Sequence, residues 1–141
     1  MRKLSSFFRL PLGQKKLICW SFVLIVAIRI GLWLLPFGLL SRLLNRFGTV
    51  EKKKTADWTT VQHIVRSVRI SSRYVPGATC LTQALASRFL LRISGQASDL
   101  KIGVEKDENN RFGAHAWIEV DGRIVIGKLP RHHRFAVLNS N

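Results

Sequence analysis

One segment restricts the possible folds more than any other: the apolar run Leu17–Leu40, LICWSFVLIVAIRIGLWLLPFGLL. A helix that is apolar on nearly all sides must be buried in protein or in lipid. The run is long enough to span a bilayer, but Arg29 lies near its middle, where an arginine costs roughly 3 kcal/mol on insertion scales. We therefore favour one hydrophobic helix, or two broken at Gly31 and Pro36, packed on the domain or lying on a membrane surface.

Charge is the second constraint. The 141-residue chain carries 23 Lys and Arg against 8 Asp and Glu, a formal net charge of +15, while 47% of its residues are hydrophobic. So much apolar surface excludes a disordered basic tail. Residues 1–54 hold 11 of the cations against Glu51 alone, which is +10 around the apolar run, and this points to a membrane surface or an acidic partner. We expect no nucleic acid as a partner, because no RNP, helix-turn-helix or zinc-finger pattern accompanies the charge.

The chain has room for one folded domain. A linker-like stretch with Gly48 and the lysines at 52–54 follows the apolar run, so we divide the chain into a basic, hydrophobic helical segment, residues 1–54, and a domain, residues 55–141. The two cysteines, Cys19 and Cys80, are too few for a disulfide-rich scaffold. No CxxC or paired Cys/His spacing is present, and we expect neither a metal nor a cofactor.

Local signals predict two helices followed by an antiparallel meander. Asp57 is a plausible N-cap for a helix over 58–70, and a second helix is expected over 80–93, after the Pro76-Gly77 loop and before Gly95. Strands are expected over 99–105, 112–120 and 123–126, with Asp121-Gly122 as a hairpin turn; residues 128–141 read as basic and irregular. This order predicts an α+β fold in which the Cys80 helix packs on a small antiparallel sheet.

Cys80 stands where a thiol is commonly activated. At a helix start, free backbone N–H groups and the positive end of the helix dipole favour the thiolate, and the same N–H groups can donate to an oxyanion. The alternative is that Cys80 is a small buried hydrophobic residue, which is the common fate of a free cysteine. Cys19, inside the apolar run, is expected to serve packing.

His115 lies in the expected strand GAHAWIEV. Because side chains alternate along a strand, His115, Trp117 and Glu119 share one face, and the aliphatic residues between them share the other. We expect the aliphatic face in the core and the Cys80 helix over the His115 face, which would form a nucleophile–base pair. The alternatives are a structural histidine, and for Trp117 either a wall of the site or core packing. His132 and His133 are expected to be solvated.

These motifs together resemble a known family. A cysteine at a helix start, followed by a strand reading HAWIEV-DG, resembles the transglutaminase-like (papain-like) cysteine protease core. More narrowly, TCLTQALASRFLLRISG, LKIGV and AHAWIEVDGRIV, in this order, resemble the leader-peptidase proteins of lasso-peptide biosynthesis. The resemblance covers roughly residues 10–135 and is most specific over 79–126.

The resemblance implies a cysteine protease that removes the leader from a ribosomally made precursor peptide, with Cys80 as nucleophile and His115 as general base. The chain has no room for the family's winged-helix leader-binding module, so it resembles the split form, which requires a separate small leader-binding protein. A lasso cyclase related to asparagine synthetases is the usual neighbour. We expect a cytoplasmic location, with membrane association through residues 17–40 as an option.

One departure concerns the acid that orients the histidine. In the family an Asp lies on the strand after the HAW strand, whereas here that region reads IVIGKL and no acid follows Asp121. We assign Asp121 to this role as the nearest downstream carboxylate, although its place in a turn favours a structural role. Glu119, an Asn or a backbone carbonyl could orient the imidazole instead. If Cys80 and His115 cannot catalyse cleavage without this acid, the alternative function is a non-catalytic scaffold module of the same fold in a maturation complex.

Overall fold

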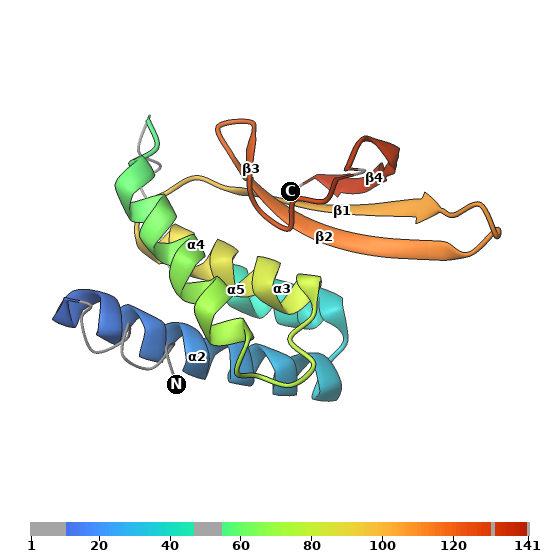
Figure 1. Ribbon diagram of the computed structural model, residues 1–141. Helices are drawn as coiled ribbons and strands as arrows, with labels where there is room; N and C mark the ends of the chain where they lie inside the picture. The colour runs from blue at the N-terminus through green and yellow to red at the C-terminus, as the bar shows by residue number, and fades with distance from the viewer. Residues whose placement is uncertain (1–10, 47–54, 131, 141) are drawn as a thin grey trace, which may run out of the picture.

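The computed structural model describes residues 11–46, 55–130 and 132–140 (Figure 1). Its helices are α2 (Leu12–Leu34), α3 (Phe37–Arg46), α4 (Trp58–Ser72) and α5 (Cys80–Ile93). Its strands are β1 (Asp99–Lys106), β2 (Phe112–Val120), β3 (Arg123–Ile126) and β4 (Ala136–Ser140), with a short 3-10 helix, η1 (His132–Arg134), before β4. The helices form one layer and the sheet the other, so the fold class is α+β as predicted. The linker stretch 47–54 lies outside the described residues, and the domain boundary there stays a prediction.

Helix α4 begins where its cap predicts. The Asp57 carboxylate accepts hydrogen bonds from the backbone N–H groups of Thr59 (3.1 Å) and Thr60 (3.4 Å) and from the Thr60 hydroxyl (2.7 Å). These contacts satisfy donors that the first turn of a helix leaves free. The apolar residues of the predicted stripe lie in the core: Val61, Val65 and Val68 are buried, together with Ile64.

Helix α5 has the predicted bounds. The Thr79 hydroxyl accepts from the Thr82 N–H (3.4 Å) at its start. Past its end, Gly95 adopts φ +74°, a left-handed conformation that glycine enters without steric cost, and the Gln96 N–H donates to the Leu91 carbonyl (2.9 Å). The helix that presents Cys80 is therefore fixed at both ends by local signals.

The sheet is antiparallel, with strand order β3-β2-β1-β4. Strands β1 and β2 pair along their whole length, from Asp99 opposite Glu119 to Lys106 opposite Phe112. The turn between β2 and β3 has φ +47° at Asp121 and φ +72° at Gly122. Positive φ at both positions fits the turn that matches the twist of paired strands, so the hairpin prediction is confirmed.

The expectation of an irregular tail over 128–141 is wrong. Residues Ala136–Ser140 form β4 and pair with β1, with a register shift between Ile102 and Gly103. The sequence AVLNS lacks regular alternation, and its pairing depends on a strand more than thirty residues earlier in the chain. Such long-range pairing leaves no local signal.

The helices cover one face of the sheet. Ala116, Ile118 and Val120 of β2 are at most 2% exposed and belong to the core that α4 and α5 complete. This confirms that the aliphatic face of β2 lies in the core. Residues between them point to the opposite face, and that face carries His115 and Trp117.

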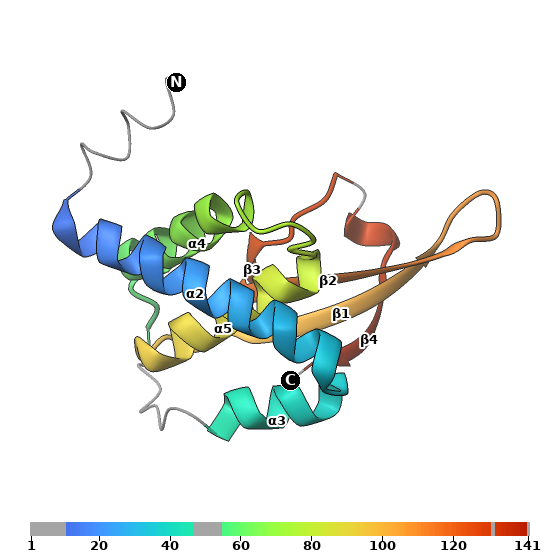
Figure 2. The same cartoon turned by 90° about the horizontal axis from the view of Figure 1, so that it is seen from below.

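The apolar run forms two helices, which confirms the alternative of a break at Pro36. Helix α2 runs without a break through Gly31, so the break considered there is wrong. The absent side chain instead admits α3: a Cβ on Gly31 would lie 3.0 Å from Leu40 Cδ1. Helix α2 packs on α4 and α5 (Figure 2), and the Ser71 hydroxyl donates to the Ile18 carbonyl (2.9 Å).

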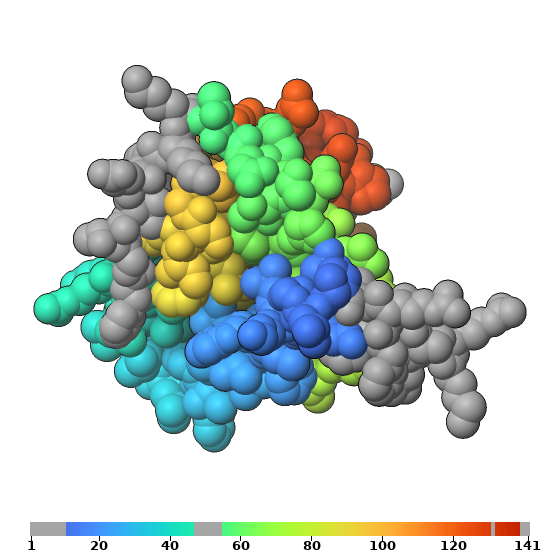
Figure 3. Space-filling model, turned by 90° about the vertical axis from the view of Figure 1, so that its left-hand side faces the viewer, coloured from blue at the N-terminus to red at the C-terminus, as the bar shows by residue number. Residues whose placement is uncertain are grey.

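Only a stripe of α2 is buried, namely Ile18, Ser21, Ile25 and Ile28. Leu17, Leu24, Val26 and Leu32 are half-buried against the core. The exposed large apolar side chains of the helix are Leu12, Trp20, Phe22, Val23, Ile30, Trp33 and Leu34. Figure 3 shows α2 as an outer flank beside α4 and α5. By length and composition α2 could cross a membrane, and 22% of its most apolar window is buried. The helix is thus a core element on one side and an uncovered apolar surface on the other.

The cap of α4 gives a stability prediction. Asp57→Ala removes the acceptor of the Thr59 and Thr60 N–H groups and should lower the free energy of unfolding by about 1 kcal/mol. Urea denaturation followed by circular dichroism measures this. Asp57→Ser keeps an acceptor and should restore most of the loss; an equal loss in both variants would contradict a capping role.

Candidate functional site

The thiol of Cys80 lies on the first residue of α5, after the loop that holds Pro76 and Gly77. Cys80 is half-buried, has a free thiol and packs against the core. The Gln83 N–H donates to the Thr79 carbonyl (3.1 Å) and the Thr82 N–H to the Thr79 hydroxyl, which occupies two donors of the first turn. No acceptor within the described residues takes the N–H groups of Cys80 and Leu81. Those two donors point out of the helix start, where a developing oxyanion could use them.

The same loop explains the arginine in the apolar run. The Arg29 guanidinium lies on the backbone of Gly77: a Cβ there would meet Arg29 Nη2 at 2.8 Å. Gly77 also has φ +72°, which favours glycine. The charge of Arg29 thus faces the loop that leads to Cys80, at the edge of the outer apolar face of α2.

His115 has a defined partner. Its Nε2 lies 2.5 Å from the backbone carbonyl oxygen of Gly127, twelve residues along the chain. Because a carbonyl oxygen can only accept, Nε2 must carry the proton of this hydrogen bond. In the neutral ring this leaves the lone pair on Nδ1, so Nδ1 is the atom available as a base.

Gly127 lies directly after β3, in the region where the sequence resemblance predicts an orienting Asp. Its φ is +80°, and a Cβ would lie 2.7 Å from the Ala116 carbonyl oxygen and 2.9 Å from Trp117 Cβ. Any other residue at position 127 would be strained at this φ, and its Cβ would clash with β2 unless the backbone moved. The backbone here approaches β2 closely enough for a carbonyl to reach the imidazole.

The predicted acids lie elsewhere. Asp121 is exposed at the tip of the β2–β3 turn, and six residues of extended strand separate its backbone from that of His115 by roughly 20 Å. The Glu119 carboxylate accepts a hydrogen bond from Trp117 Nε1 (2.8 Å). The structure therefore does not bring Asp121 to His115. The group that orients the imidazole is instead a backbone carbonyl, that of Gly127.

The expectation that the Cys80 helix covers the His115 face is wrong. Helix α5 packs under the aliphatic face of β2, because Ala116, Ile118 and Val120 fill the core with it. The His115 ring lies on the opposite face, against Phe135 (ring centroids 5.5 Å apart) and His132 (6.3 Å). No hydrogen bond joins the Cys80 thiol to the His115 ring, both of which are described.

Strand β2 is open beside His115. Strand β3 pairs only with residues Ile118–Val120 of β2. Gly127 directly follows the last paired residue of β3, Ile126. Within the described residues, no other strand pairs with this edge of β2.

An aromatic cluster of His115, Trp117, His132 and Phe135 covers this face of the sheet. Trp117 is 2% exposed, and the His132 ring meets it edge-on at 4.3 Å between centroids. A Cβ on Gly103 would meet both the Trp117 ring and Phe135 Cβ at 2.9 Å, so only a glycine on β1 admits the cluster. Trp117 is therefore buried beside His115, on the face of the sheet away from the hydrophobic core.

His132 is not solvated, which corrects the expectation for it. Both of its ring nitrogens are inaccessible to solvent and have no hydrogen-bond partner among the described residues. Loss of hydration lowers the pKa of His132, and the neighbouring His115 and Lys128 lower it further, while Glu119 opposes them. Sequence reasoning missed His132 and Phe135 because the tail carries no signal of where it packs.

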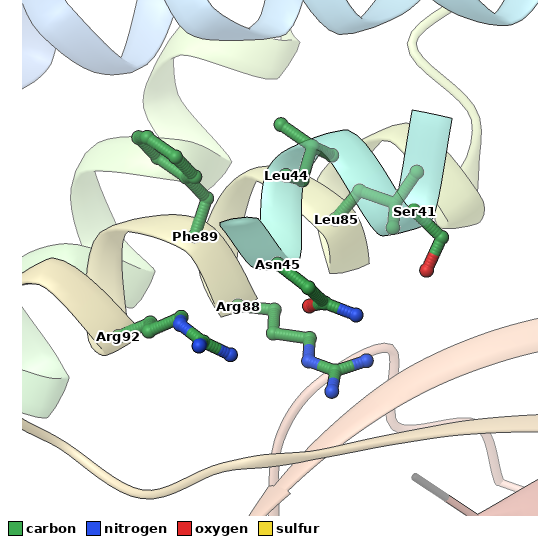
Figure 4. Close-up of a pocket in the computed structure, with 7 residues that line it drawn as sticks. All are labelled: Ser41, Leu44, Asn45, Leu85, Arg88, Phe89 and Arg92. Carbon is green, nitrogen blue, oxygen red and sulfur yellow. The ribbon is translucent and has the colours of Figure 1, made fainter. Parts of the chain in front are cut away.

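The described residues form two cavities that are candidates for a substrate site. The cavity between α3 and α5 (Figure 4) has a volume of about 10 Å³, room for one water molecule. Beside it, burial and the charge of Arg92 lower the pKa of Arg88, with Asp99 opposing. The other is an open groove of about 580 Å³ between α4 and β3. Among the described residues, no cluster of His, Cys, Asp and Glu could hold a metal ion.

Comparison with known proteins assigns the fold to a family. Residues 22–140 match the transglutaminase-like superfamily. No curated protein and no solved structure gave a significant match. The match includes α3, all four strands and both residues proposed for catalysis.

The contact at Gly127 can be tested with a matched pair of glycines. Gly127→Ala should lower the thermal midpoint by several degrees and displace the carbonyl from His115, because the Cβ clashes with β2. Gly122→Ala also places alanine at positive φ (+72°), but with nothing within 4 Å, so it should cost less. Ring ¹⁵N NMR of His115 should report an Nε2–H tautomer that only Gly127→Ala disturbs. Equal effects of the two substitutions would contradict the contact.

The lowered pKa of His132 gives a pH prediction. Below the ordinary histidine value of about 6.5 the unfolded chain takes up a proton that the folded ring resists, so stability falls as pH drops through this window. Thermal midpoints should fall more steeply between pH 7 and pH 5 in the wild type than in His132→Gln. His133→Gln, the exposed neighbour, should keep the wild-type slope. An unchanged slope in His132→Gln would contradict the assignment.

Proposed function

The chain belongs to the transglutaminase-like superfamily, which includes cysteine peptidases, and we propose that it is itself a cysteine peptidase. The observation that carries the proposal is the hydrogen bond of His115 Nε2 to Gly127, since it leaves Nδ1 free as a base in a family whose chemistry uses a cysteine on a helix start. The Cys80 thiol at the first turn of α5 supplies the nucleophile.

The proposed reaction is acyl transfer to a thiol. His115 Nδ1 takes the Cys80 proton, and the thiolate attacks the scissile carbonyl to give a tetrahedral oxyanion, which the N–H groups of Cys80 and Leu81 can stabilise. The imidazolium returns its proton to the leaving amine. Water, deprotonated by the same Nδ1, then hydrolyses the thioester. A carbonyl partner orients the ring but supplies no negative charge, so it stabilises the imidazolium less than an Asp would.

For this reaction Cys80 and His115 must meet. In the unliganded protein they make no hydrogen bond, and catalytic hydrogen bonds are often completed only when substrate binds. The open edge of β2 beside His115 leaves a route for the imidazole and the thiol to approach each other. We propose that substrate or partner binding brings them together.

The proposed substrate is the precursor of a lasso peptide, from which the enzyme removes the leader. The ordered motifs around Cys80, the IGV sequence of β1 and the HAW sequence of β2 support this. The proposed partners are a small winged-helix leader-binding protein and a cyclase related to asparagine synthetases. The released amine of the core peptide would be the group that the cyclase joins.

A second candidate is a scaffold module without catalysis. The absence of a Cys80–His115 hydrogen bond and the glycine in place of an orienting acid both favour it. In this role the chain would hold the leader-binding protein and the cyclase together.

Cleavage of a precursor peptide distinguishes the two. With the leader-binding protein present, the wild type should split leader from core, and Cys80→Ala should lose this activity by about a thousandfold or more. Mass spectrometry follows the products, and Cys19→Ala should cleave normally. No cleavage by the wild type, with leader binding shown, would support the scaffold; cleavage that survives Cys80→Ala would contradict Cys80 as nucleophile.

We further propose a cytoplasmic protein whose α2 lies flat on a membrane surface. One stripe of α2 is committed to the protein core, and the outer side carries exposed apolar residues with two tryptophans, which favour membrane interfaces. Lys15, Lys16, Arg42 and Arg46 near the apolar surface would attract anionic headgroups.

Vesicle flotation tests this placement. Val23→Glu with Ile30→Glu, both on the exposed side of α2, should reduce flotation with phosphatidylglycerol vesicles severalfold, because glutamate disfavours lipid contact. Phe112→Glu with Leu138→Glu adds the same two charges at exposed residues of the sheet and should float as the wild type does. Equal flotation of all variants would contradict the placement, and resistance to carbonate extraction would instead indicate a spanning helix.

A further inference from the structure

The groove between α4 and β3 is lined by cations above an apolar floor. Arg66 and Arg69 line it from exposed positions on α4, and Arg73 lines it from the exposed C-cap position that follows the helix. Its floor includes the buried Val61 and Val65. The remaining lining residues are Trp58, Gln62, Ile70 and Val125, and none of them is acidic. Neither the proposed thiol chemistry nor the membrane face uses this groove.

The arginines form a regular row. Positions 66, 69 and 73 lie on one face of a helix, and seven residues of helix separate the outer two by about 10.5 Å. At one end Arg123 of β3 lies over the Trp58 ring, 5.2 Å from its centroid, and adds a fourth cation. On an extended peptide, residues two positions apart share a face at a spacing of about 7 Å, so carboxylates at alternate positions of a bound strand would lie within reach of this row of long side chains.

The floor distinguishes a peptide from other anions. Val61, Val65 and Ile70 offer apolar contact between the arginines, which suits leucine-like side chains interspersed with acids. A single-stranded nucleic acid would need several aromatic platforms for its bases, and the lining has one, Trp58. Arginine pairs with carboxylates through two parallel hydrogen bonds, which gives geometric preference as well as charge.

The groove is connected to the strand that leads to His115. Arg69 Nη2 donates to the Val125 carbonyl at 3.0 Å, and Gly127, two residues further, holds the His115 ring. A segment in the groove would therefore lie along β3 on the side away from β2.

From the row of arginines, the apolar floor and the absence of lining acids, we propose that this groove binds an extended acidic peptide segment with interspersed apolar residues, supplied by a protein partner. The net charge of +15 alone would attract any polyanion. Beyond this general attraction, binding of the acidic peptide depends on the arginines of the groove more than on an equal number of cations elsewhere in the chain.

Fluorescence anisotropy with a labelled octapeptide, Glu-Glu-Leu-Glu-Glu-Leu-Glu-Glu, tests this with the full chain in 0.15 M salt. The triple variant Arg66→Gln, Arg69→Gln, Arg73→Gln should weaken binding about tenfold, the effect of three partly exposed ion pairs together. The charge-matched control Arg42→Gln, Arg46→Gln, Arg111→Gln removes three exposed cations outside the groove and should weaken binding about twofold. The double variant Arg66→Gln, Arg73→Gln keeps the Arg69–Val125 bond and should show most of the loss while unfolding as the wild type does.

Equal weakening by the two triple variants would overturn the proposal in favour of attraction by net charge alone. An octapeptide with serine in place of leucine should bind several-fold more weakly; equal binding would overturn the role of the floor. Polyuridine or phosphatidylglycerol vesicles that bind through the three arginines more tightly than the peptide would overturn the choice of a peptide. All of these experiments measure binding and none measures cleavage, so their outcomes do not depend on whether Cys80 is catalytic.

Discussion

The alternation of side chains along β2 is the constraint on which the rest of the structure depends. Because Ala116, Ile118 and Val120 fill the core above α4 and α5, the residues between them must face away from the helices. That requirement places His115 and Trp117 under η1 and the start of β4. It also means that the helix carrying Cys80 and the ring of His115 approach β2 from different sides.

The environment of His115 follows from close backbone approaches. A glycine at 103 admits the Trp117 and Phe135 side chains, and a glycine at 127 lets the chain after β3 touch β2. The carbonyl of Gly127 then fixes which imidazole nitrogen carries the proton. In place of a carboxylate the protein uses a peptide group, which orients the ring without adding charge next to His132, whose pKa burial already lowers.

Local signals predicted most of the fold, and contacts distant in sequence account for what they missed. Asp57, Gly95 and the Asp121-Gly122 pair predicted where α4 starts, where α5 ends and where β2 turns, because each acts on its own backbone. The pairing of β4 with β1 depends on a partner more than thirty residues away. Gly31 stays inside α2, where its missing side chain admits Leu40 of α3. In the site, Cys80 at a helix start was predictable, whereas a carbonyl at Gly127 is common to every residue type and has no sequence signature. The packing of His132 on Trp117 required the course of the whole tail.

The central claim is that Cys80 is activated by His115, and the relative alkylation rates of the two cysteines test it most directly. Cys19 is exposed and Cys80 half-buried, so accessibility alone makes Cys19 the faster to react with iodoacetamide. Because the thiol and the imidazole are proposed to meet only when substrate or partner binds, the precursor peptide and the leader-binding protein are present throughout. Mass spectrometry of tryptic peptides over a time course would then give both rates in the wild type and in His115→Ala. We predict that Cys80 reacts faster than Cys19 in the wild type and loses this advantage in His115→Ala, while the rate of Cys19 stays the same. A Cys80 that reacts more slowly than Cys19, at a rate that His115→Ala leaves unchanged, would contradict it.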